Sequence, residues 1–92
     1  MSTVRLVATV SGDVQGVGFR YRTRQQAEQL GLVGSATNRP DGSVLVVAAG
    51  PSSSVDQLLK WLHSGNTPGR VENVDADLHD DGASGLTGFV TD

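Results

Sequence analysis

The sequence predicts an α+β fold: an antiparallel sheet with two helices packed on one face, in the β-α-β-β-α-β order of a ferredoxin-like sandwich. Two observations carry this prediction. Short runs alternate between apolar and polar residues, as half-buried strands do, and two longer runs repeat their apolar residues at helical spacing. The chain has 92 residues, which is enough for one domain with one modest core. We therefore expect a single domain over residues 1–92.

The first half of the chain is predicted to form a strand, a helix and a second strand. Residues 4–10 alternate in polarity, which is typical of a strand with one buried face. From about residue 19 to residue 30 the apolar side chains share one helical face, and Gly31 follows at the position of a C-cap glycine. Residues 32–38 predict a second strand, although small residues weaken its signal.

The second half begins with a hairpin and a second helix. Residues 39–42 read Arg-Pro-Asp-Gly, the composition of a turn, and residues 43–49 form the strongest strand signal of the chain. Ser53 and Asp56 match a capping box, which predicts that the second helix begins there. Its apolar stripe, spaced by three, four and seven residues, comprises Val55, Leu58, Leu59 and Leu62.

Two more strands are predicted near the C-terminus. Residues 74–78 alternate as a fourth strand, a polar loop covers residues 80–85, and residues 86–91 predict a short last strand. The acids in this part of the chain lack the spacing and the closing glutamate of an EF-hand. A solvated strand face and loop is therefore a better interpretation than a calcium site, and no metal site is predicted. The acids concerned are Asp75, Asp77, Asp80 and Asp81.

Charge is distributed unevenly along the chain, whose formal net charge is −3. Residues 1–46 carry five arginines against three acids, and residues 47–92 carry two basic residues against seven acids. General nucleic-acid binding needs a broad basic face, so this balance argues against it. The basic residues gather instead at Arg20, Arg22 and Arg24, which favours a small anionic ligand.

Several classes of protein are excluded by composition. The chain has no cysteine, which excludes disulfides, thiolate chemistry and cysteine-ligated metal sites. No apolar run is long enough to span a bilayer, and the N-terminal residues do not form an export signal. We therefore expect a cytoplasmic protein that binds neither membranes nor nucleic acid.

The segment most indicative of chemistry runs from Gly12 to Arg20 and reads Gly-Asp-Val-Gln-Gly-Val-Gly-Phe-Arg. Inward-turned amides next to a helix N-terminus can bind an anion such as phosphate, and Arg20 would add a planar cation. The spacings of nucleotide-binding glycine loops are absent. The glycines alone could equally form a tight strand-to-helix connection. An arginine at a helix start is unfavourable, however, unless an anion is nearby.

Asn38 is the second candidate, because its amide could hold a water molecule at the end of the second predicted strand, beside the glycine loop. The alternative is an Asx-turn residue that precedes the hairpin turn. His63 and His79 each lack a partner at the spacing of a catalytic triad, and His63 suits a surface position in the last turn of a helix.

The chain resembles the acylphosphatase family in motifs that span nearly its whole length. Residues 14–20, Val-Gln-Gly-Val-Gly-Phe-Arg, match the family signature V-Q-G-V-x-F-R. Residues 30–38 match L-G-L-x-G-x-x-x-N, and residues 41–44 match the hairpin that follows. The pairs Gly50-Pro51 and Trp61-Leu62 also fit the family.

This resemblance implies a monomer that hydrolyses a small-molecule acyl phosphate to a carboxylate and inorganic phosphate, without metal, cofactor or covalent intermediate. It implies that Arg20 grips the phosphate and that Asn38 positions the attacking water. Gly12 and Thr23 would support the loop. The phosphate cradle would consist of the backbone amides of Gln15, Gly16, Val17, Gly18, Phe19 and Arg20.

Three residues depart from the family pattern. Asp13 stands where the family usually has a basic residue, so we expect weaker attraction of the substrate. Ser35 replaces a tryptophan and Thr91 replaces an apolar residue, which predicts lower stability. The alternative function is a ferredoxin-like module that binds a small anion or a protein partner without turnover.

Overall fold

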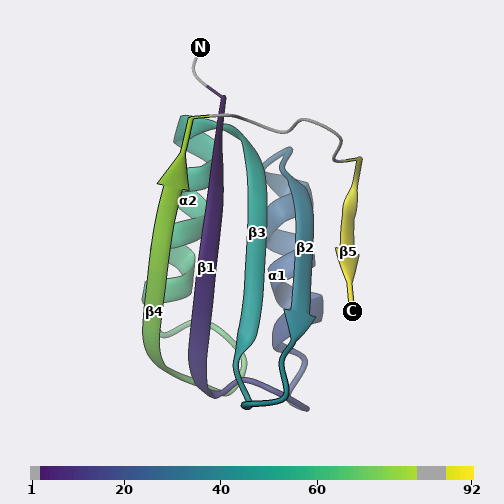
Figure 1. Ribbon diagram of the computed structural model, residues 1–92, viewed down its shortest axis with the longest axis vertical. Helices are drawn as coiled ribbons and strands as arrows, with labels where there is room; N and C mark the ends of the chain where they lie inside the picture. The colour runs from purple at the N-terminus through teal and green to yellow at the C-terminus, as the bar shows by residue number, and fades with distance from the viewer. Residues whose placement is uncertain (1–2, 81–86) are drawn as a thin grey trace.

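Strands and helices follow the predicted β-α-β-β-α-β order, with a fifth strand at the end. The computed structural model describes residues 3–80 and 87–92. Both helices cover the same face of the sheet (Figure 1), which confirms the predicted fold class. The elements are β1 (Thr3–Asp13), α1 (Phe19–Gln29), β2 (Val33–Asn38), β3 (Val44–Pro51), α2 (Ser52–His63), β4 (Arg70–His79) and β5 (Phe89–Thr91).

The sheet is mixed, which corrects the prediction of a purely antiparallel one. Its strand order is β4-β1-β3-β2-β5, and every pair is antiparallel except β2 with β5. The cause is visible in Figure 1: β5 starts at the end of the sheet where β4 finishes, so the two strands run in opposite directions. β1 and β2 are both antiparallel to β3, so they run in the same direction, and β4 runs antiparallel to β1. A strand that is antiparallel to β4 must therefore be parallel to β2.

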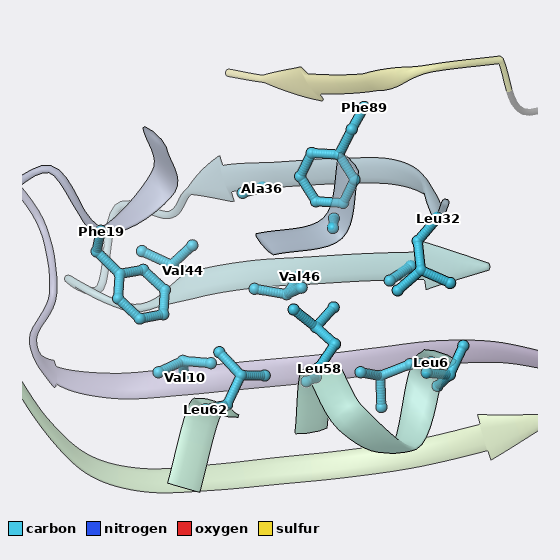
Figure 2. Close-up of a cluster of buried hydrophobic side chains, with 14 of the residues drawn as sticks. Leu6, Val10, Phe19, Leu32, Ala36, Val44, Val46, Leu58, Leu62 and Phe89 are labelled. Atoms are coloured by element: carbon cyan, nitrogen blue, oxygen red, sulfur yellow. The ribbon is translucent and has the colours of Figure 1, made fainter. Parts of the chain in front are cut away.

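The core lies between the helices and one face of the sheet. Alternate residues of β1 and β3 point toward α2 there, and Leu58 and Leu62 pack onto them (Figure 2). The predicted stripe of α2 is buried except for Leu59, which is only partly buried. On α1 the buried residues are Phe19, Thr23 and Ala27, one turn apart along one face of the helix.

The start of α2 differs from the prediction. The helix begins at Ser52 and its N-cap is Pro51, with no side-chain cap hydrogen bond, so the capping box of Ser53 and Asp56 is wrong. Pro51 is the last residue of β3 and has an extended conformation (φ −56°, ψ 140°). The helix therefore follows the strand directly, and Ser53 already lies in its first turn.

The predicted turns are confirmed. Gly31 follows the C-cap of α1 with a φ of 73°, and the amide of Leu32 donates to the carbonyl of Ala27. In the hairpin between β2 and β3, the amide of Arg39 donates to the carbonyl of Ser43 at 2.9 Å. The predicted loop at 80–85 and the start of the last predicted strand lie largely outside the described residues.

Candidate active site

The loop between β1 and α1 has backbone conformations that glycine allows. Gly16 and Gly18 have φ values of 75° and 82°, in the left-handed region that other residues rarely adopt. Gly18 is the N-cap of α1, and no side chain caps this helix end. The first turn also contains no acidic residue. Among the described residues, the positive end of α1 thus has neither a side-chain cap nor an acid in its first turn, which suits the binding of an anion.

Buried side chains anchor the loop where it meets α1. Phe19 is only 1% exposed, and its ring stacks on the ring of Trp61 with the centroids 6.2 Å apart. The hydroxyl of Thr23 is buried and donates to the backbone oxygen of Phe19 at 2.8 Å. Thr23 thus braces the first turn of α1, directly behind Arg20.

At the other end the loop is held against β4. The register of β1 on β4 shifts between Ser11 and Gly12, which is a β-bulge. A Cβ at position 12 would overlap the backbone oxygen of Arg70. Only glycine therefore allows β1 and β4 to approach this closely as the chain turns into the loop.

The side chain of Gln15 connects the loop to the hairpin, a contact that the sequence reasoning missed. Its Nε2 donates to the backbone oxygens of Arg39 at 2.7 Å and of Ser43 at 2.9 Å. The only signal in the sequence was a long polar side chain within a predicted anion-binding loop. Its partners could not be identified from that signal, because they are 24 and 28 residues away in the sequence. The tether fixes the loop relative to the strand that ends in Asn38.

The hairpin is itself braced by Asp41. Its Oδ1 accepts a hydrogen bond from the hydroxyl of Ser43 at 2.6 Å and another from the amide of Ser43 at 2.9 Å. The Ser43 hydroxyl, and after it the Ser43 amide, hold the pKa of the Asp41 carboxyl below its usual value. Asp41 therefore fixes Ser43, one of the two residues whose backbone oxygen accepts a hydrogen bond from Gln15.

Arg20 and Asn38 come together at the last residue of the chain. The Arg20 guanidinium and the Asn38 backbone amide both donate to the backbone oxygen of Asp92. The Oδ1 atom of Asn38 is buried and has no hydrogen-bond partner among the described residues. The structure thus brings the two predicted catalytic residues to one place. It also adds Asp92, for which nothing in the sequence pattern suggested a role at the site.

A cavity of about 150 Å³ opens beside the loop. It is lined by Val14, Gly16, Gly18, Phe19, Arg20, Tyr21 and Thr91. Two larger hollows, of about 330 and 390 Å³, lie along β4 and α2 and do not contain Arg20. Asn38 lines none of the three. We assign the site to the smallest of the three, because it is the one that contains the N-terminus of α1 and the arginine.

Comparison with known proteins adds independent information. The sequence profile of the acylphosphatase family matches residues 6–91. The chain belongs to the acylphosphatase family. An acylphosphatase from Paenarthrobacter aurescens is 54% identical over 85% of this chain and 83% of its own length. One from Saccharopolyspora erythraea is 55% identical over 94% of this chain and 90% of its own.

Solved acylphosphatase structures have the same fold. The crystal structure of acylphosphatase from Bacillus subtilis superposes with a TM-score of 0.88 at 29% identity, covering 97% of this chain and 98% of that one. An acylphosphatase from Coxiella burnetii gives a TM-score of 0.84 at 34% identity, over 99% and 94% of the two chains. As an acylphosphatase family member, this chain is an enzyme that hydrolyses acyl phosphates.

Within residues 3–80 and 87–92, no three histidine, aspartate or glutamate side chains gather as a metal site would require. In the same residues, neither helix is long and apolar enough to cross a membrane. The acids on β4 are exposed, in agreement with their interpretation as a solvated strand face.

Proposed function

We propose that Arg20 and the amides of residues 15–20 bind the phosphoryl group, and that Asn38 holds the attacking water. One observation carries this proposal: Oδ1 of Asn38 is buried without a partner among the described residues, while the backbone amide of Asn38 and the guanidinium of Arg20 donate to the same oxygen of Asp92. A buried acceptor without a partner destabilises a fold by roughly 1–3 kcal/mol. That penalty is explained if Oδ1 accepts a hydrogen bond from the water that reacts.

The chemistry needs no general acid. The carboxylate that leaves has a pKa of about 4, by analogy with aspartate and glutamate, so it departs as a stable anion. The water oxygen forms a bond to phosphorus as the bond to the bridging oxygen breaks, and the bridging oxygen leaves with the electron pair. Phosphate has a second pKa of about 6, so the phosphoryl oxygens can take the proton of the water.

Positioning and charge stabilisation then account for catalysis. In phosphoryl transfer the main contributions are alignment of the nucleophile and stabilisation of charge on the equatorial oxygens. Asn38 would supply the first, whereas Arg20 and the amides at the N-terminus of α1 would supply the second. Gln15 would maintain the spacing between them, because it ties the loop to the hairpin.

The test is phosphate release from an aryl acyl phosphate by single variants. We expect Arg20→Ala and Asn38→Ala each to lower kcat by about 100-fold or more, as removal of one preorganised donor does in other enzymes. Arg22→Ala and Asn66→Ala are matched controls, because both side chains are exposed and make none of the contacts described above. A chelator should leave the rate unchanged.

The outcomes separate the proposal from its alternative. Full activity of either variant would contradict the assigned role of that residue. Saturable binding of phosphate by the wild type without any turnover would instead support the non-catalytic binding module.

We also propose that the protein acts as a monomer in the cytoplasm. The proposed mechanism requires no residue from a second copy of the chain. Sedimentation at working concentration tests the oligomeric state, and fractionation of the source cell tests the location.

A further inference from the structure

The cavity beside the loop is small for a whole aryl acyl phosphate. Its volume of about 150 Å³ is half or less of the roughly 300–1,000 Å³ of typical small-molecule sites. If the phosphoryl group binds at the loop, as proposed above, it leaves too little of this space for an aryl group. A bulky acyl group must then extend across the rim of the cavity and contact the side chains that lie there.

The exposed residues other than glycine that line the cavity are Thr91 and Tyr21, and the larger of the two is Tyr21. It follows Arg20 directly, lines the cavity and is 61% exposed. Four large hydrophobic residues in the described part of the chain are exposed by 43% to 61%, and Tyr21 alone among them lines this cavity. The others are Val17, Leu78 and Val90.

The ring of Tyr21 is not part of the hydrophobic core. The buried residues of α1 are Phe19, Thr23 and Ala27, and Tyr21 lies on a different face of the helix. Its hydroxyl accepts a hydrogen bond from Nε2 of Gln25, one turn further along, at 3.1 Å. This contact restrains the ring along the helix surface, where its apolar faces stay largely exposed.

We propose that Tyr21 forms part of the subsite for the acyl group, and that its ring raises kcat/KM for aromatic acyl phosphates relative to acetyl phosphate. This inference rests on the proposed function of the loop. An aryl group can pack or stack against the phenol ring, whereas a methyl group covers little of it. The contact forms in the bound substrate as well as in the transition state, so it acts mainly on KM.

The experiment compares benzoyl phosphate with acetyl phosphate, in which the same bond is cleaved. For each variant we consider the ratio of the two kcat/KM values, because intrinsic reactivity cancels when ratios are compared between variants. We expect Tyr21→Ala to lower kcat/KM for benzoyl phosphate about three- to tenfold, through KM, and for acetyl phosphate less than about twofold. Tyr21→Phe, which keeps the ring, should retain most of the preference.

Leu78→Ala is the matched control, because Leu78 is 59% exposed on β4 and lines a different hollow. It should change neither rate. An unchanged ratio in Tyr21→Ala, with both substrates still turned over, would overturn the subsite alone. A loss of equal size for both substrates would also overturn it, since the ring would then act on the phosphoryl site. Failure of the wild type to hydrolyse either substrate would overturn the proposed function as well.

Discussion

Asp13 places a negative charge at the start of the loop that is proposed to bind an anion. The side chain is exposed, and its partner across the strands is Arg70, the first residue of β4. Opposite charges at directly paired positions attract each other. The register therefore offers partial compensation for the acid, which the family motif alone did not indicate. The expected weakening of substrate attraction is a prediction about KM rather than about the chemical step.

Replacement of this acid should strengthen substrate binding. We expect Asp13→Asn to lower KM for an acyl phosphate about twofold at low salt, because repulsion of the anion is removed. The difference should vanish near 1 M salt, where the Debye length is about 3 Å. Steady-state kinetics at the two salt concentrations measure this, with Asp75→Asn as a control for the same change of net charge on β4. A salt-independent effect would contradict the electrostatic explanation.

At the scale of elements, the site depends on contacts between the loop and the β2–β3 hairpin. Gln15 reaches the backbone of the hairpin, and Asp41 orders the same backbone through Ser43. The apolar periodicity of the sequence does not indicate the role of any of these residues. The loop and Asn38 are therefore coupled through the turn, although they belong to separate sequence motifs.

The hairpin should lose this support in acid. Because the pKa of Asp41 is lowered in the fold, its contribution to stability is present above the usual carboxyl pKa, about 4, and disappears as the pH falls through the lowered value. We expect Asp41→Ala to lower the melting temperature at neutral pH, and the difference from the wild type to shrink below about pH 4. Thermal unfolding followed by circular dichroism across this pH range measures the difference. An equal difference at neutral and acidic pH would contradict the role of the charged carboxylate.

At the scale of the whole molecule, β5 joins the C-terminal residues to the site. Phe89 is buried in the core, whereas the backbone of Asp92 bonds to Ala36, Asn38 and Arg20. β5 therefore contributes both to the stability of the core, through Phe89, and to the position of Arg20, through Asp92. Thr91 is exposed, so its polar side chain is not forced into the core. Ser35 lies on the face without helices, paired with Val47 and Val90.

Loss of the Phe89 anchor should reduce both stability and activity. We expect Phe89→Ala to lower the free energy of unfolding by about 3 kcal/mol, and to lower kcat/KM of the folded fraction because β5 no longer holds Asp92 against Arg20. Chemical denaturation and kinetics at low temperature provide the two measurements. Leu58→Ala is a core deletion on α2 of similar cost, about 3 kcal/mol, and should spare the activity of folded molecules. Equal losses of activity in both variants would argue against a specific role of β5.

Much of this fold could be predicted from periodicity. Both helices, the first four strands, the hairpin turn and the cap at Gly31 rest on residues close in sequence, so local pattern was sufficient. The direction of β5 could not be predicted, because it depends on which edge of the sheet the chain reaches after β4. The start of α2 was wrong because Pro51 ends the strand and leads directly into the helix, which overrides the capping pattern.

The candidate site divides in the same way. Gly16, Gly18 and Arg20 form one continuous motif, and Asn38 belongs to the next, so the sequence indicated them. The tether of Gln15, the support by Asp41 and the contact of Asp92 with Arg20 all join distant segments. Only the folded arrangement reveals such contacts, because side-chain type alone does not determine the partner.

The stacked pair of Phe19 and Trp61 has a practical consequence. The chain contains one tryptophan, and its ring lies against the residue that precedes Arg20. The tryptophan fluorescence of the unlabelled protein therefore originates from a single residue next to the loop. Titration with inorganic phosphate can be followed optically in wild type and variants alike, which separates occupancy of the cradle from turnover in one sample.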